Sequence, residues 1–291
     1  MYDLETLLEQ SQELPPLPEI YLKVSELLES ENSNVQQVGE AVQTDPSLTA
    51  RVLKMINSAY YGLSSEVSSI SQAISLLGRQ QIKQILMGSV LAGVFNDINV
   101  DSFPLNDFWQ HSIKTAIIAR HLAMQNVHVI DHEAFFTAGL LHDVGRLVIA
   151  QVAADELAEI DLLVKSDDVD IVELEAEILG VSHIEVGAAL MRKWGMPSLL
   201  TQCLVKHHDV EHVGPFAVDT SIVYLANQLS HFELANDEEE MLAILETIPN
   251  WQKTDCTAEQ IEIACKLADD QWFEVMESLG MAERVVYDEF F

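Results

Sequence analysis

The chain has 291 residues, of which 48% are hydrophobic, and its 15 Lys and Arg face 47 Asp and Glu, a formal net charge of −32. This length is sufficient for about two domains with a sizeable core, and this hydrophobic share excludes a disordered chain. The charge argues against binding to nucleic acid or to an anionic membrane surface, because the basic residues are scattered and form no patch.

The beginning of the chain and its cysteines indicate the compartment. The first ten residues, MYDLETLLEQ, lack the basic start and apolar run of a signal peptide. The most apolar run, residues 85–95, is too short to span a bilayer and predicts a buried helix. Three cysteines without CxxC spacing argue against a disulfide framework. We therefore expect a cytoplasmic protein that contacts other proteins.

The apolar periodicity is helical along most of the chain. Apolar side chains recur at intervals of three and four in residues 17–30, 48–62 and 70–78. Asp45 followed by Pro46 predicts a helix start, as does Ser182, while Gly62 and Gly78 predict helix ends. No run alternates apolar and polar residues as a half-buried strand would. The sequence therefore predicts an all-α protein with roughly a dozen or more helices.

Four polar or proline-rich breaks interrupt the helical pattern. Residues 13–20, ELPPLPEI, are typical of a stiff loop that leads into a helix, which we favour, or of a proline-rich ligand for a partner. The further breaks lie at residues 97–104, 166–170 and 236–240. The last of them opens an acidic segment of about two helices.

The stretch AGLLHDVGRLVIA, residues 138–150, places His142 and Asp143 among apolar residues. Ionisable side chains are costly in such surroundings unless something binds them. Neighbouring residues on a helix diverge by about 100°. The pair can therefore serve one ion only over its shared edge, or Asp143 can bridge two ions. We expect Gly145 to bend or end the helix there, which would help.

Further histidines have a helical context. Asp107 precedes His111 by four residues, which puts both side chains on one helix face. His183 follows a predicted helix start, and His207 and His208 close the helix LLTQCLVKHHDV. Helical bundles assemble metal sites from several helices in this way. A set of His and Asp suits a divalent ion of the Fe, Mn, Zn or Ni type.

The remaining histidines are expected to be ordinary core or surface residues, because a single histidine on a helix is more often hydrogen-bonded than a metal ligand. They are His121, His128, His132, His212 and His231. One adjacent His and Asp also arises by chance. The metal hypothesis therefore depends on the combination of motifs along the chain.

These motifs, in this order, resemble the HD-domain superfamily of metal-dependent phosphohydrolases and, more closely, the HDOD family of bacterial signalling output domains. The resemblance covers residues 14–230 and is carried by DPSLTARVLKMINSAYYG, SSISQAISLLGRQQIKQIL, EAFFTAGLLHDVGRLVIA and HIEVGAALMRKWGMP. It implies an all-α multi-helix bundle with an N-terminal helical subdomain and an HD-like helical core. We expect an HDOD-like domain at 12–235, divided into an N-terminal part (12–100) and a metal-site core (101–235), and an acidic helical segment at 236–291.

The related HD-GYP phosphodiesterases imply a ligand set that is nearly complete here. The implied metal ligands are Asp107, His111, His142, Asp143, His183, His207, His208 and Asn227. Asp107 stands where these relatives have Glu, Asn227 where they have Asp, and Arg146 where they have Lys. Asn227 offers a neutral oxygen, and the GYP loop that should follow His208 is absent. Both departures speak against hydrolysis of cyclic di-GMP.

Two functions follow from this resemblance. The favoured one is a signal-transduction output or scaffold module that keeps one or two divalent ions and acts through signalling proteins. The alternative is an active metal-dependent phosphohydrolase for a phosphodiester or nucleotide. In that enzyme Asp143 would bridge the ions or orient the nucleophile, and Arg146 would hold the phosphate bidentately. Asn227 and the absent loop favour the first function, and the retained ligands favour the second.

Overall fold

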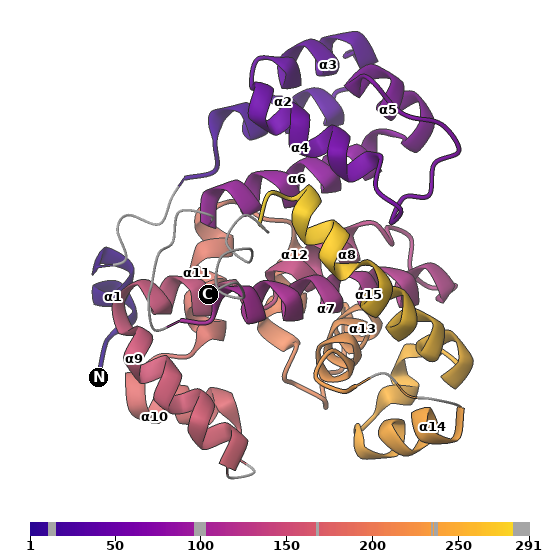
Figure 1. Ribbon diagram of the computed structural model, residues 1–291. Helices are drawn as coiled ribbons and strands as arrows, with labels where there is room; N and C mark the ends of the chain where they lie inside the picture. The colour runs from indigo at the N-terminus through magenta and orange to yellow at the C-terminus, as the bar shows by residue number, and fades with distance from the viewer. Residues whose placement is uncertain (11–15, 96–102, 167–168, 234, 236–237, 282–291) are drawn as a thin grey trace, which may run out of the picture. The chain divides into compact units, whose positions relative to one another are not determined.

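A computed structural model describes residues 1–10, 16–95, 103–166, 169–233, 235 and 238–281. Over these residues the chain consists of helices joined by turns and loops and contains no strand, which confirms the predicted all-α fold (Figure 1). The predicted breaks at 13–20, 97–104, 166–170 and 236–240 lie partly outside the described residues. The chain divides into two compact units. We call them the histidine unit (Met1–Pro16, Ile98–Cys265) and the smaller unit (Leu17–Asp97, Lys266–Phe291).

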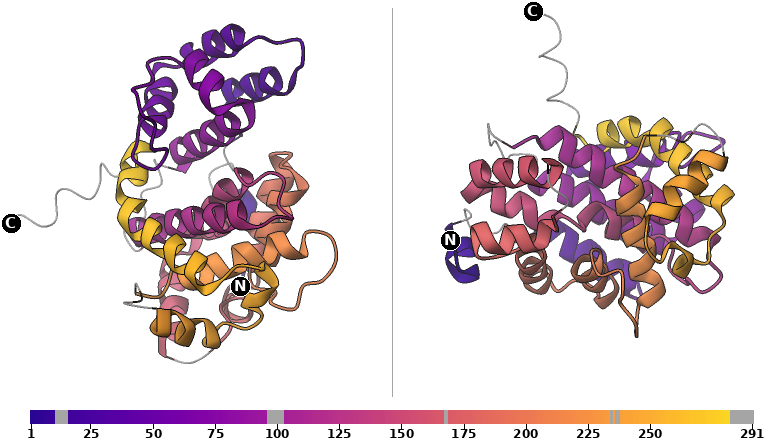
Figure 2. Two further views of the ribbon diagram at one scale, coloured as in Figure 1. Left: turned by 90° about the vertical axis from the view of Figure 1, so that its right-hand side faces the viewer. Right: turned by 90° about the horizontal axis from the view of Figure 1, so that it is seen from below.

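The smaller unit contains five helices that pack against one another, seen from two further sides in Figure 2. They are α2 (Glu19–Glu29), α3 (Val35–Gln43), α4 (Pro46–Ile56), α5 (Ile70–Leu77) and α6 (Arg79–Phe95). As predicted, Asp45 caps α4 by accepting a hydrogen bond from the backbone of Leu48, with Pro46 at the first helical position. Gly78 ends α5 with a φ of 86°.

Helix α6 contains the apolar run predicted as a buried helix, and its residues from Ile85 to Ala92 are buried. The C-terminal part of α15 (Ala258–Ser278) also belongs to the smaller unit and contacts the region of α4. Lys54 Nζ donates to the carbonyl of Glu277 at 3.1 Å, and the backbone N–H of Ala59 donates to Glu274 Oε1 at 2.8 Å.

The histidine unit holds the other helices and the beginning of α15. They are α1 (Leu4–Gln10), α7 (Leu105–Gln125), α8 (Ala134–Leu141), α9 (Val144–Ser166), α10 (Ile171–Leu179), α11 (His183–Lys193), α12 (Ser198–Lys206), α13 (Ala217–Leu229), α14 (Glu238–Thr247) and the 3-10 helix η1 (Trp251–Thr254). Helix α8 is buried along its whole length and contacts α7, α12 and α13. It is the central helix of this unit.

Two glycines allow neighbouring helices of the histidine unit to come very close. A Cβ at Gly139 of α8 would lie 2.5 Å from the Cα of Ala116 on α7. A Cβ at Gly145 of α9 would lie 1.9 Å from the carbonyl oxygen of His183 on α11. Real Cβ atoms do not approach so closely, so each position requires glycine. The second approach sets the beginning of α9 against the beginning of α11.

The helix expected to contain the adjacent His and Asp is interrupted at these two residues. Helix α8 ends at Leu141, His142 and Asp143 form a turn, and α9 begins at Val144. The sequence predicts a bend or end at Gly145, but the helix is interrupted just before that residue. Gly145 serves the close approach to α11 and lies in the first turn of α9.

The structure also bears on the expectations about disulfides and membrane-spanning helices. Cys203, Cys256 and Cys265 are buried free thiols, so the described chain contains no disulfide. Among the described helices, none combines the length and the apolar character that crossing a membrane would require.

Candidate metal centre

Five implied ligands lie at helix ends or turns of the histidine unit, and a sixth lies inside a helix. His142 and Asp143 form the turn between α8 and α9, and His183 is the first residue of α11. His207 and His208 follow α12, and His111 lies in the second turn of α7. Side chains at helix ends can reach inward between neighbouring helices, so residues far apart in the sequence meet in one place.

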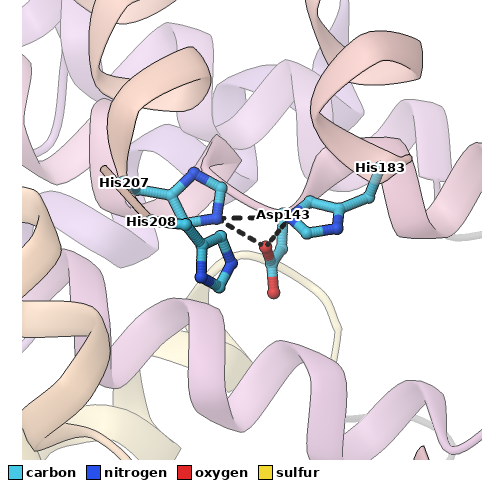
Figure 3. A group of neighbouring side chains, drawn as sticks. All are labelled: Asp143, His183, His207 and His208. Atoms are coloured by element: carbon cyan, nitrogen blue, oxygen red, sulfur yellow. Dashed lines mark hydrogen bonds and ion pairs between the residues drawn. The ribbon is translucent and has the colours of Figure 1, made fainter. Parts of the chain in front are cut away.

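These side chains form two groups of donor atoms that share Asp143. The His111 group consists of His111, His142 and Asp143, and the His183 group consists of Asp143, His183, His207 and His208. Within each group the ligand atoms lie within 4.8 Å of one another. Figure 3 shows the carboxylate of Asp143 between the ring of His183 on one side and the rings of His207 and His208 on the other.

Each oxygen of Asp143 faces one of the two groups. Oδ1 lies 3.2 Å from Nε2 of His207 and 3.5 Å from Nε2 of His183. Oδ2 lies 3.5 Å from Nε2 of His142 and 3.8 Å from Nε2 of His111. Oδ1 is buried and receives no hydrogen bond from any described residue. Leaving a buried carboxylate oxygen without a donor is costly, and a bound cation would remove that cost.

The outer ring nitrogens of two histidines contact backbone carbonyls. Nδ1 of His142 lies 2.6 Å from the carbonyl oxygen of Gly139, and Nδ1 of His207 lies 2.6 Å from that of Leu204. A carbonyl oxygen only accepts, so in each neutral ring Nδ1 carries the proton. Nε2 of each ring is then left with its lone pair.

The other two rings have side-chain partners. Nδ1 of His183 lies 2.6 Å from Oε2 of Glu175, a carboxylate acceptor. Nδ1 of His111 lies 2.8 Å from Oγ of Ser230, whose hydroxyl donates to the carbonyl of Asn227 at 2.7 Å. With its proton on the carbonyl of Asn227, the hydroxyl of Ser230 accepts a hydrogen bond from Nδ1–H of His111. Neutral His183 and His111 therefore also present an unprotonated Nε2.

The four Nε2 lone pairs meet at short distances. Nε2 of His111 and Nε2 of His142 lie 3.1 Å apart, and the Nε2 atoms of His183 and His207 lie 3.4 Å apart. With no proton between them, such lone pairs repel each other. A divalent cation would turn each contact into a pair of ligand bonds, and imidazole with carboxylate suits Fe, Mn, Zn or Ni. The donor set therefore fits a metal ion.

Protons are poor substitutes for a cation at three of the ligand histidines. Burial lowers the pKa of His142 to about 4, and burial together with the neighbouring His142 lowers the pKa of His111 well below its ordinary value. Burial also lowers the pKa of His208. The pKa of Asp143 lies well below its ordinary value, because the surrounding histidines outweigh the opposing effect of burial. The site thus keeps the carboxylate of Asp143 beside neutral rings of His111, His142 and His208. The pKa of His183 is raised instead, because the effect of burial is outweighed by the neighbouring carboxylate of Glu175.

Arg146, the residue expected to hold a phosphate, is already paired with carboxylates. Its Nη2 lies 2.5 Å from Oδ1 of Asp161, and its Nε lies 3.7 Å from Oε1 of Glu175. Burial is outweighed by these neighbours, which raise the pKa of Arg146. A phosphate would have to compete with both carboxylates for this guanidinium.

The remaining two implied ligands are Asp107 and Asn227. Asp107 is exposed in the first turn of α7 and lies in neither donor group. Its four-residue spacing puts it about 6 Å along the helix axis from His111. Asn227 is 3% exposed in α13, and its backbone carbonyl holds the hydroxyl of Ser230.

Three residues contact the ligands without being singled out by the sequence. Glu175 and Ser230 bind the outer nitrogens of His183 and His111. His231, expected to be ordinary, stacks on His111 with ring centroids 4.4 Å apart and 23° between the ring planes. For Glu175 the sequence offers one signal, Gly180, which ends α10 shortly before His183 begins α11. A short connection between these two helices brings Glu175 near His183. Ser230 and His231 had no local signal.

A known family and known structures resemble the chain. The HDOD domain family matches residues 14–210. A protein from Shewanella amazonensis SB2B, provisionally named a phosphohydrolase, superposes with a TM-score of 0.77 at 27% identity, and the match covers 94% of this chain and 97% of that one. A protein from Marinobacter aquaeolei VT8, provisionally named a signal transduction protein, superposes with a TM-score of 0.68 at 26% identity, covering 95% of this chain and 60% of that one.

A curated relative is much longer than the region it shares with this chain. A protein from Treponema pallidum (strain Nichols) is 24% identical over 200 residues, which is 69% of this chain and 38% of that protein. The chain therefore spans well under half of this relative.

Proposed function

Because the chain belongs to the HDOD domain family, we propose that it is a signal-transduction output module whose histidine unit binds one or two divalent metal ions. The observation that carries the metal part is the meeting of four Nε2 atoms around the buried carboxylate of Asp143. Signalling proteins are the proposed partners, in keeping with the name of the Marinobacter relative. With a net charge of −32, the chain favours partners with basic surfaces.

Metal content tests this proposal directly. The protein is purified without a polyhistidine tag, and bound Fe, Mn, Zn and Ni are measured by mass spectrometry. We expect the wild type to carry up to two ions and His207→Asn to carry fewer. His128→Asn, whose side chain is 65% exposed and in neither donor group, is the matched control and should equal the wild type. A wild type with no more metal than His207→Asn would overturn the proposal.

Metal-dependent phosphoester hydrolysis is a second candidate, favoured by the way Asp143 divides its oxygens between the two donor groups. Two cations sharing a carboxylate would supply Lewis-acid chemistry for a phosphodiester or nucleotide. The pairing of Arg146 with Asp161 and Glu175 weighs against it. Asn227 is also neutral, whereas the HD-GYP phosphodiesterases are expected to have a charged Asp at this position.

Turnover of a model substrate distinguishes the two candidates. Bis(p-nitrophenyl) phosphate is offered to protein loaded with each of the four metals, with Asp143→Asn as control. The output-module proposal predicts the same background rate for both proteins. Turnover that depends on Asp143 would instead support the hydrolase.

A further inference from the structure

A buried carboxylate lies directly behind one of the ligand histidines. Glu175 of α10 is fully buried and belongs to neither donor group. Its Oε2 accepts the backbone N–H of His183 at 2.7 Å and Nδ1–H of the same residue at 2.6 Å. Burying a carboxylate is costly unless partners compensate it. Both of these hydrogen bonds go to the first residue of α11, so this carboxylate acts on His183.

Arg146 of α9 supplies the compensating charge. Its Nε lies 3.7 Å from Oε1 of Glu175, while its Nη2 lies 2.5 Å from Asp161. The guanidinium of Arg146 is thus shared by the carboxylates of Asp161 and Glu175. One of these two negative charges remains without a compensating positive charge from Arg146. That charge sits on the side of His183 that faces away from Asp143.

Among the four ligand histidines whose outer nitrogens contact a partner in the described part of the chain, only His183 has a charged one. The partners of His142 and His207 are backbone carbonyls, and that of His111 is the hydroxyl of Ser230. Hydrogen bonds to ionised groups are about twice as strong as neutral ones. A carboxylate behind a ligating imidazole fixes its tautomer and raises its basicity.

We propose that Glu175 is a positioning residue, with Arg146 nearby as its compensating charge, that locks Nε2 of His183 toward Asp143 and makes the His183 group the tighter of two cation positions. The affinity part rests on the proposed metal binding, and the tautomer part does not. The composition of the His183 group points the same way, because it offers four donor residues against three in the His111 group.

The tautomer is tested on metal-free protein by long-range ¹H–¹⁵N NMR of the His183 ring. At a pH above the raised pKa of His183, the wild type should show Nδ1–H only. Glu175→Gln, which keeps an amide oxygen as acceptor, should retain this tautomer, and Glu175→Leu should give a mixture with Nε2–H. Glu177→Leu, at an exposed position of the same helix, is the matched control. A folded Glu175→Leu with the wild-type tautomer, or a wild type with Nε2–H, would overturn the tautomer part.

Affinity is tested by titrating the metal-free full chain with Co²⁺ and following the visible absorption. We expect Glu175→Gln to weaken the tighter position about tenfold, within the range typical for residues behind metal ligands, and Glu177→Gln to leave it unchanged. His111→Asn should remove only the weaker position. Equal affinity of Glu175→Gln and the wild type, or loss of the tighter position in His111→Asn, would overturn the assignment.

The two proposals fail in different ways. A wild type that binds no Co²⁺ overturns the proposed metal binding together with the assignment of the tighter position. In that case the NMR result still decides whether Glu175 positions His183.

Discussion

The same local contact orients two of the histidines. His142 follows α8, His207 follows α12, and each ring donates from Nδ1 to a carbonyl three residues earlier. Carbonyls in the last turn of a helix have no donor within the helix. The ring satisfies such a carbonyl and, in doing so, turns Nε2 inward. His142 and His207 therefore each cap the end of a helix and, at the same time, hold Nε2 in the orientation that a ligand needs.

The buried ring of His142 should make the stability of the metal-free protein depend on pH. Burial lowers the pKa of His142 to about 4, against about 6.5 in an unfolded chain. Below pH 6.5 the unfolded chain takes up a proton that the folded protein does not. The contribution of His142 to the free energy of unfolding is therefore full above about pH 6.5 and declines, by about 1.4 kcal/mol per pH unit, as the pH falls toward 4.

Urea unfolding of metal-free wild type and His142→Asn between about pH 7 and 5 measures this contribution. The amide of the variant can still donate to Gly139. Lower pH also relieves repulsion among the 47 acidic residues in both proteins. The informative quantity is therefore the difference between the two proteins, and a difference that does not change with pH would contradict the expectation.

Gly145 provides a test of the close approach between α9 and α11. A Cβ there would lie 1.9 Å from the carbonyl oxygen of His183, so Gly145→Ala must push the two helices apart. We expect a loss of about 1–3 kcal/mol in the free energy of unfolding, typical of overpacking, and weaker metal binding. Gly93→Ala is the control, because its nearest atom is the end of the flexible Arg51 side chain at 3.2 Å. Equal unfolding midpoints in urea would refute this reason for the glycine.

The residues that could be predicted for the site are those with a local signal. His142 beside Asp143 and the adjacent His207 and His208 stand out in the sequence, because ionisable groups lie where the helical pattern is apolar or ends. Ser230 meets His111 across 119 positions of the chain. Only the packing of α13 on α7 brings them together, and no local pattern encodes that packing. For this reason the ligands were easier to predict than the groups that orient them.

At the scale of the helix, capping places His183. Ser182 and Glu185 form a capping box at the start of α11, and the predicted cap at Ser182 is confirmed. We expect Ser182→Ala to cost about 1 kcal/mol of stability and to weaken metal binding, because the fraying first turn carries His183. Thermal unfolding and the Co²⁺ titration measure the two effects.

The smaller unit offers a matched control for this prediction. Asn34 and Gln37 form an equivalent capping box at the start of α3. Asn34→Ala should cost a similar amount of stability while leaving the affinity for Co²⁺ unchanged. If the two variants bound Co²⁺ equally well, the cap at Ser182 would have no specific role at the site.

Some helix boundaries with their own capping chemistry could be predicted, whereas α4 ends at Ile56 and not at Gly62 as predicted. Asp45 and Pro46 begin α4, and Gly78 ends α5, as their residue types indicate. In contrast, α9 is kinked at Ala153, with φ −140° and ψ 47°, where neither glycine nor proline marks a break. Alanine favours helix, so the residue type at this position does not predict the kink.

For the whole molecule, metal binding would offset part of the destabilising effect of the net charge. A chain with a net charge of −32 repels itself when folded. Divalent ions at the two donor groups would neutralise part of this charge at the place where Asp143 and Glu175 are buried. Anything that binds only the folded state stabilises it, by about 2.7 kcal/mol at a hundredfold excess over its Kd.

Removing metal should therefore lower the unfolding temperature of the histidine unit and leave the smaller unit unaffected. All candidate ligands belong to the histidine unit. Calorimetry of the wild type before and after EDTA, followed by dialysis and added Mn²⁺ or Zn²⁺, should show one transition falling by roughly 5–10 °C and recovering. His207→Asn should show a much smaller shift, because it lacks a ligand. A transition that EDTA and added metal leave in place would contradict metal binding, and equal shifts of both units would mean that they unfold as one.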